Sequence, residues 1–139
     1  MKQALILGCS HAAGSELGED SFARANSYPA LVASSLGYNV TNLGIPGGSN
    51  DAMFRLFLDH ANDYDLVIAA WSGFNRSEFF YNDAWYNLAP GAAMSSIKEY
   101  HKQWYVHNAH DTQGRLNKIK NVIALNSLSS VPVINCESF

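Results

Sequence analysis

Three short polar segments contain the residues whose types could do chemistry. The first contains Ser10 and His11, the second is rich in glycine around Gly47, and the third contains Ser72 and Asn75. A serine hydroxyl can attack an acyl carbon, and backbone or carboxamide N–H groups can stabilise the oxyanion that develops. Glycine suits such a site because it lets the backbone approach the reacting carbonyl. These residue types point to acyl transfer, with Ser10 as the nucleophile and Gly47 and Asn75 as donors.

Each polar segment follows a run of residues that predicts a β-strand. The runs are residues 4–7, 38–43 and 65–71, and residues 131–135 predict a fourth strand. The first and third runs are apolar throughout, which is typical of parallel strands buried on both faces. Because ligands bind outside the carboxyl ends of parallel strands, we expect the three polar segments to meet at one edge of the sheet.

Helices are predicted between these strands, at about residues 27–37, 50–62 and 112–129. The residues predicted to face the core are Leu31, Val32 and Leu36, then Met53, Phe54, Phe57, Leu58 and Ala61, then Leu116, Ile119, Val122, Ile123 and Leu125. Alternating strands and helices of this kind predict a parallel sheet covered on both faces. The fold class is therefore α/β, a three-layer domain over residues 1–139 with about four strands.

The stretch from residue 78 to residue 105 is unusually rich in aromatic side chains. We predict that it is irregular to about Gly91 and helical after that. Packing within the core or a lid accounts for aromatics of this kind, and a surface that faces a carbohydrate or another subunit is the alternative.

Composition narrows the possible partners. Nine Lys and Arg against twelve Asp and Glu give a net charge of −3 without a basic run, which argues against nucleic-acid binding. No apolar stretch reaches the roughly 20 residues that span a bilayer, and no leader pattern precedes the first strand. We therefore expect a cytoplasmic protein, of the host cell if the source is viral, or one associated with a virion. Charged residues make up only 15% of the chain, which suggests that a partner covers part of its surface.

The cysteines and histidines do not have the spacing of metal ligands. Cys9 and Cys136 lie near opposite ends of the chain and are predicted to be free thiols. No His, Asp or Glu cluster has metal-ligand spacing either, so no metal or cofactor is expected. A phosphate-binding loop at residues 8–15 was the weakest alternative, since no recognisable phosphate-loop pattern is present.

The polar segments resemble the conserved blocks of a known family. Residues 6–11, Ile-Leu-Gly-Cys-Ser-His, resemble block I of the SGNH/GDSL hydrolases, with Cys9 where the family has aspartate. Residues 42–47 are similar to block II, whose glycine donates an oxyanion-hole N–H; Gly47 is the best match and Gly44 the second. Residues 72–75 stand where block III belongs, and an ungapped alignment places Phe74 on the family's asparagine and Asn75 one position later.

The resemblance implies a flavodoxin-like parallel sheet and an esterase that cleaves acyl esters, such as an acetylated carbohydrate, through Ser10. It covers residues 1 to about 80, and this variant of the blocks looks like SGNH-like proteins of tailed phages. The family's general base comes from a later Asp-x-x-His block after a fifth strand, and no such motif occurs in this sequence. We expect a domain truncated after its fourth strand, and a serine without a base is a poor nucleophile.

Three sources of a base remain open: His110, a partner chain, or a missing C-terminal segment. His110 is expected at the edge that carries Ser10, because the helix from about Thr112 must run back to the start of the fourth strand. Asp111 is predicted to be the N-cap of that helix rather than a catalytic carboxylate.

The alternative function is a catalytically inactive SGNH-like module, structural or ligand-binding, and possibly part of a phage particle. Without a fifth strand the fourth would be an exposed sheet edge, so we expect a homo-oligomer or a partner chain to cover it.

Overall fold

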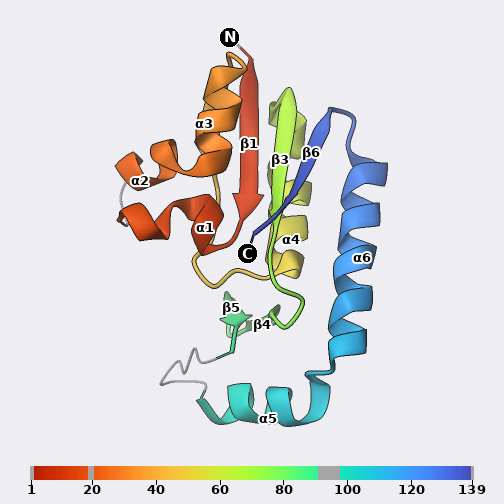
Figure 1. The fold of residues 1–139 in the computed structure, drawn as a ribbon. Helices are drawn as coiled ribbons and strands as arrows, with labels where there is room; N and C mark the ends of the chain where they lie inside the picture. The colour runs from red at the N-terminus through yellow and green to blue at the C-terminus, as the bar shows by residue number, and fades with distance from the viewer. Residues whose placement is uncertain (1, 19–20, 91–97, 139) are drawn as a thin grey trace.

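The computed structural model describes residues 2–18, 21–90 and 98–138, and its centre is a four-stranded parallel sheet. The strands are β1 (Gln3–Gly8), β2 (Asn39–Asn42), β3 (Leu66–Trp71) and β6 (Val133–Glu137), in the order β2-β1-β3-β6 (Figure 1). Ile6 lies opposite Asn42 on one side and Ile68 on the other, and Ile68 in turn lies opposite Ile134. The predicted strands are confirmed, the last of them two residues later than expected.

Helices cover both faces of this sheet. One face is covered by α1 (Ser10–Ala13), α2 (Ser21–Asn26) and α3 (Tyr28–Ser35), and the other by α4 (Asn50–His60) and α6 (Asp111–Leu128) (Figure 1). Two short 3₁₀ turns follow α1 and α4, at Ser15–Leu17 and Ala61–Asp63. Side chains alternate along β1, so Ile6 packs under the first helix layer and Leu7 under the second. The predicted three-layer α/β fold is confirmed.

Helix α3 contacts the sheet through its small residues, contrary to prediction. Ala30 and Ala33 are fully buried, whereas Leu31, Val32 and Leu36 face solvent, Leu31 with 53% of its surface exposed. Alanines let the helix lie close to the β1–β3 face, and this turns the larger apolar side chains outward. Ser27 is the N-cap residue of this helix, and its hydroxyl donates to the Arg24 carbonyl (3.1 Å) instead of capping a helix N–H.

Helices α4 and α6 bury narrower stripes than their sequences suggest. Ser49 caps α4 by accepting a hydrogen bond from the Ala52 N–H (3.1 Å), and Met53 and Phe57 are buried while Leu58 is exposed. On α6 the buried residues are Asn121 and Leu125. The predicted stripe on α6 is therefore wrong for Leu116, Ile119 and Ile123, each more than half exposed. The face of α6 that turns toward α4 runs through Asn117, Asn121 and Leu125, spaced four residues apart.

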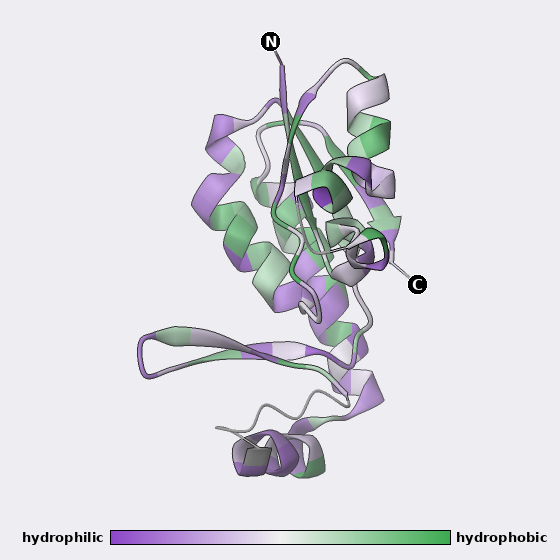
Figure 2. Cartoon of the chain, turned by 90° about the vertical axis from the view of Figure 1, so that its left-hand side faces the viewer, coloured by the Kyte–Doolittle hydropathy of each residue, from purple (hydrophilic) through white to green (hydrophobic). Residues whose placement is uncertain are grey.

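The stretch predicted to be irregular is an antiparallel hairpin. Strands β4 (Ser77–Tyr81) and β5 (Ala84–Leu88) are joined by Asn82 and Asp83, both with positive φ (47° and 58°), as a two-residue hairpin turn requires. The predicted helix follows as α5 (Lys98–Asn108), and the beginning of that prediction falls outside the described residues. We call β4, β5 and α5 the arm, because they extend beyond the carboxyl ends of the sheet strands (Figures 1 and 2).

One ion pair and a set of ring contacts hold the arm. The Arg55 guanidinium of α4 binds both carboxylate oxygens of Glu78 (2.9 and 3.0 Å) and lies 4.6 Å from the centre of the Trp85 ring. On the other face of the hairpin, the Phe79 ring stacks on Tyr86 and on Tyr100 of α5, with centroids 5.5 and 4.4 Å apart. The arm is thus attached to the sheet layers mainly through polar contacts with α4. No helix in the described part of the chain has the length and apolar character to cross a membrane.

Candidate functional site

Ser10 stands at the carboxyl edge of the sheet, as the first residue of α1. Strand β1 ends at Gly8, Cys9 is extended, and the Ala13 N–H bonds to the Cys9 carbonyl (2.9 Å) to start the helix. A Cβ on Gly8 would lie 2.4 Å from Ala12 Cβ and 3.0 Å from Ala70 Cβ. Glycine is therefore required for the chain to fold back so tightly. The half-buried Ser10 owes its position to this turn.

The glycine loop between β2 and α4 lies against this turn. The Ile45 N–H donates to the Gly8 carbonyl (2.9 Å), and the Asn42 carboxamide donates to the Ala12 carbonyl (2.7 Å). Asn42 Oδ1 also accepts the Gly44 N–H (2.9 Å), so that this N–H is not free for a substrate. Gly47 differs: its φ is 72°, the position of an added Cβ is open space, and its N–H has no partner among the described residues.

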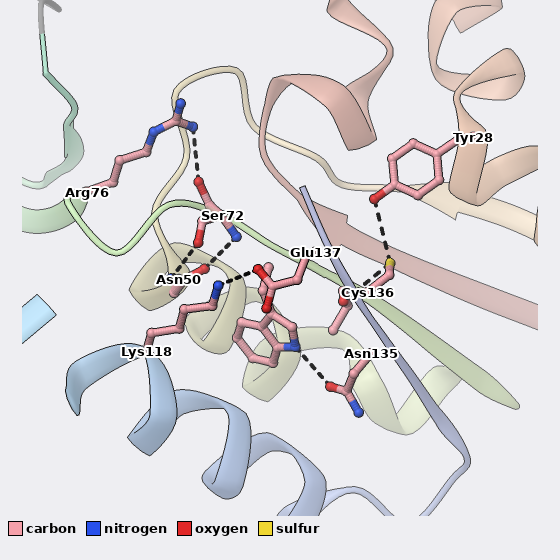
Figure 3. A network of polar contacts seen from close by, with 10 residues as sticks. Tyr28, Asn50, Ser72, Arg76, Lys118, Asn135, Cys136 and Glu137 are labelled. Atoms are coloured by element: carbon pink, nitrogen blue, oxygen red, sulfur yellow. Dashed lines mark hydrogen bonds and ion pairs between the residues drawn. The ribbon is translucent and has the colours of Figure 1, made fainter. Parts of the chain in front are cut away.

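The end of β3 is fixed by Asn50, the first residue of α4. Asn50 Oδ1 accepts the Ser72 N–H (2.8 Å), while Asn50 Nδ2 donates to the Ser72 carbonyl (3.1 Å), and both residues are buried. Arg76 Nη1 then donates to Ser72 Oγ (3.0 Å) (Figure 3). The only sequence signal for Asn50 was its place after Gly47-Gly48-Ser49. Its role depends on the tertiary meeting of α4 with β3.

The Cys9 thiol lies beside the same network, between the end of β1 and the first residue of α1. Burial raises the pKa of this thiol, but the nearby Ser138 hydroxyl, His11 backbone and Ser72 hydroxyl, together with the positive charge of Arg76, outweigh burial and lower the pKa. Cys9 is only 2% exposed. The thiol is free, as predicted.

The second cysteine lies on β6, on the sheet face that α3 covers. Cys136 Sγ lies 3.6 Å from the Tyr28 hydroxyl and donates to the Ala69 carbonyl (3.7 Å). Burial, together with the neighbouring Cys136 thiol, raises the pKa of Tyr28 to about 12. Sequence reasoning did not connect Tyr28 with this edge, because a contact between α3 and β6 leaves no local pattern.

Asn75 and His110 lie in a cleft between the arm and α6. The cleft has a volume of about 640 Å³ and is lined by residues 74–77, the end of α5 and the first turns of α6. His110 is the N-cap of α6, so the prediction that Asp111 would cap this helix is wrong, and Asp111 is its first residue. Residue 110 is extended (φ −113°, ψ 132°), as an N-cap should be, and its carbonyl accepts the Gly114 N–H (2.9 Å).

Two of the four predicted catalytic residues are therefore neighbours, and the other two lie elsewhere. Ser10 and Gly47 are not among the residues that line the cleft. Within the described ranges, no side chain hydrogen-bonds to the Ser10 hydroxyl. Those ranges also contain no group of three His, Cys, Asp or Glu side chains that could hold a metal ion.

Strand β6 forms one outer edge of the sheet, since it pairs only with β3 among the described strands. Side chains also join β6 to its neighbours. Trp71 Nε1 of β3 donates to Asn135 Oδ1 (2.9 Å), and Lys118 of α6 forms an ion pair with Glu137 (Figure 3).

Residues 12–130 match the model of a family described as "Family of unknown function (DUF6071)". The match covers most of the chain, so the chain belongs to this family. No curated protein matches the sequence.

Proposed function

We propose that this member of the DUF6071 family is a serine acyl hydrolase of the SGNH/GDSL type, with Ser10 as the nucleophile. The observation that carries the proposal is the tight turn at Gly8, which presents Ser10 at the carboxyl edge of β1. The glycine loop is bonded to this turn, because the Ile45 N–H donates to the Gly8 carbonyl. Ligands of open parallel sheets bind at this edge.

In this proposal Ser10 Oγ attacks the carbonyl carbon of an acyl ester, and its proton passes to a base. The backbone N–H groups of Ser10 and Gly47 would then bind the oxyanion of the tetrahedral intermediate. The Gly44 N–H is already bonded to Asn42, which favours Gly47 of the two glycines. The alcohol leaves with a proton from the base, and water releases the acyl group from Ser10.

The general base is the part of this mechanism that the described residues do not supply in contact with Ser10. His110 lies in the cleft beside the arm, together with Asn75. It would reach Ser10 only if the arm and the start of α6 moved toward the sheet. A second chain is another source of the base.

The separation of His110 from Ser10 favours a second candidate function, a non-catalytic module of the same fold. In that case the outer edge of β6 would be the functional surface, and a second copy or a partner chain would pair with it. A gel-filtration mass equal to that of the monomer would count against pairing between copies.

Labelling with a fluorophosphonate, followed by intact-mass measurement, separates the two candidates. The hydrolase proposal expects one adduct on the folded chain that disappears in Ser10→Ala. Ser15→Ala is the matched control, a half-buried serine just after α1, and should label like the unmodified chain. Circular dichroism shows whether each variant is folded. Absence of an adduct on folded protein would refute the hydrolase and leave the non-catalytic module.

A further inference from the structure

The cleft beside the arm is a second place where chemistry-bearing side chains converge. Four segments build its walls: Asp51 at the start of α4, residues 74–77 after β3, the end of α5, and residues 109–120. Its volume of about 640 Å³ falls within the range of small-molecule sites. Nothing in the proposed hydrolysis at Ser10 uses most of these residues.

The walls are fixed by contacts that do not involve a ligand. Gly114 of α6 lies so close to the loop after β3 that an added Cβ would be 2.3 Å from the Phe74 carbonyl oxygen. The Tyr105 hydroxyl of α5 donates to the Asn75 carbonyl (2.9 Å), which ties the arm to the same loop. Contacts within the chain therefore hold these walls in place.

Four carboxamide side chains belong to its polar lining. They are Asn75, Asn108, Gln113 and Asn117, of which Asn117 already donates a hydrogen bond to Asp51. A carboxamide offers both a donor and an acceptor, as a hydroxyl group does, so a row of carboxamides matches a ligand with several hydroxyls. An acyl chain would instead need a mostly apolar lining.

The charged groups of the lining balance each other. Asp51 and Asp111 are matched by Arg76 and Lys120, leaving His110 aside. Asp51 is also occupied, since it accepts hydrogen bonds from Asn117 (2.8 Å), Asn121 (3.0 Å) and Ser77 (3.2 Å). A nucleotide or an acidic peptide would need an excess of positive charge, which the cleft does not have.

An aromatic side chain completes the lining. Trp104 of α5 is half-buried in the cleft wall, where its ring meets Tyr105 edge-on with centroids 5.0 Å apart. This T-shaped contact with Tyr105 helps to hold the indole ring in the cleft wall. An indole face is a flat apolar surface on which the C–H side of a sugar ring can lie.

From carboxamides, balanced charge and an indole ring, we propose that this cleft binds a neutral oligosaccharide. Binding does not require Ser10 to react. If the proposed hydrolase function holds, the cleft would bind the carbohydrate part of an acylated substrate. If it fails, the cleft would make the chain a carbohydrate-binding module.

The test is an NMR titration of the ¹⁵N-labelled full chain carrying Ser10→Ala, so that hydrolysis cannot intervene. The probes are triacetylchitotriose, maltotriose and xylotriose, each up to about 10 mM, with AMP and a glutamate-rich peptide as charged comparison ligands. At least one trisaccharide should shift the amides of residues 74–77 and 108–117 with millimolar affinity. Trp104→Ala should weaken that affinity about tenfold or more.

Val106→Ala is the matched control, because Val106 lies on the same helix, is exposed and does not line the cleft. It should leave the affinity within about twofold. Gln113→Ala, on an exposed residue, provides a second cleft variant if Trp104→Ala does not fold. The proposal is overturned if no trisaccharide shifts these amides, if the shifts survive both cleft variants, or if only AMP or the peptide binds there. Fluorophosphonate labelling of Ser10 is read separately, so either proposal can fail without the other.

Discussion

The sheet layers and the arm are built on different physical principles. In the sheet layers, the side chains of residues 4–7 in β1 and 66–71 in β3 are buried almost completely, and helices cover both faces of the sheet. In the arm, Phe80, Tyr81, Trp85 and Tyr100 each expose about half of their surface. The arm is held by stacked rings, by one ion pair to α4, and by hydrogen bonds from Ser77 to Asp51 and from Tyr105 to the Asn75 carbonyl. The sheet is therefore stable through burial, whereas the arm depends on a few specific contacts and can open separately.

The largest expected effect is on the sheet. Leu7→Ala should lower the free energy of unfolding by about 2–5 kcal/mol, because Leu7 is fully buried and its removal leaves a cavity. Leu36→Ala is the matched control, because Leu36, the C-cap residue of α3, is also a leucine but is 57% exposed. This substitution should lower the free energy of unfolding by under about 1 kcal/mol. Urea denaturation measures both. Equal losses at the two positions would show that α3 turns its large residues inward, as the sequence alone suggested.

A smaller and more local effect is expected in the arm. Arg55→Leu removes the partner of Glu78, whose side chain is only 4% exposed, and leaves a buried carboxylate without its cation. We expect a loss of about 1–3 kcal/mol that appears as faster hydrogen exchange in β4 and β5, with β1 and β3 little changed.

The double variant Arg55→Leu with Glu78→Leu serves as its control. It should restore part of the protection of β4 and β5 from hydrogen exchange, because no charge is then buried without a partner. Equal loss of protection in the sheet and in the hairpin would show that the arm does not open separately.

The smallest effect concerns the Cys9 thiol at the sheet edge. Its pKa is lowered in the folded chain, so the thiolate contributes stability above the usual thiol pKa, and this contribution is lost as the pH falls through the folded value. In a Cys136→Ser background, thiolate absorbance should titrate below the usual value of about 8.5. Ser138→Ala should raise this pKa, and Arg76→Gln should raise it less. Ser130→Ala, an exposed serine, should not change it; a titration unaffected by Ser138→Ala would refute the assignment.

The sheet was predictable because continuous apolar runs have few alternatives to buried parallel strands. Residues 4–7 and 65–71 could hardly form anything else. The inward face of α3 was not predictable in this way, because the largest side chains were assumed to face the core while the alanines do so. The hairpin had a signal that was missed: Asn82-Asp83 suits a turn with positive φ, and aromatic residues, which favour strands, flank it on both sides.

For the site, sequence reasoning placed Ser10 and Gly47 at the correct sheet edge because each follows a predicted parallel strand, β1 and β2 in the structure. It also expected His110 on that side of the sheet, and the structure places this residue beyond the carboxyl end of β3, in the cleft between the arm and α6, with Ser10 outside the cleft lining. The position of the arm was not encoded in any local pattern. The same holds for the Asn50–Ser72 pair, which forms only when the start of α4 meets the end of β3.

The place of the arm in the chain also determines when the sheet can be completed. Strand β3 pairs with β1 on one side and with β6 on the other, and the whole arm and α6 separate β3 from β6 in the sequence. During synthesis, β3 therefore emerges with one apolar edge open and stays so until residues 133–137 follow. Closing such a long loop slows folding. In the meantime the nascent chain exposes an unpaired strand edge, which is the kind of surface that associates with other chains before the native pairing forms.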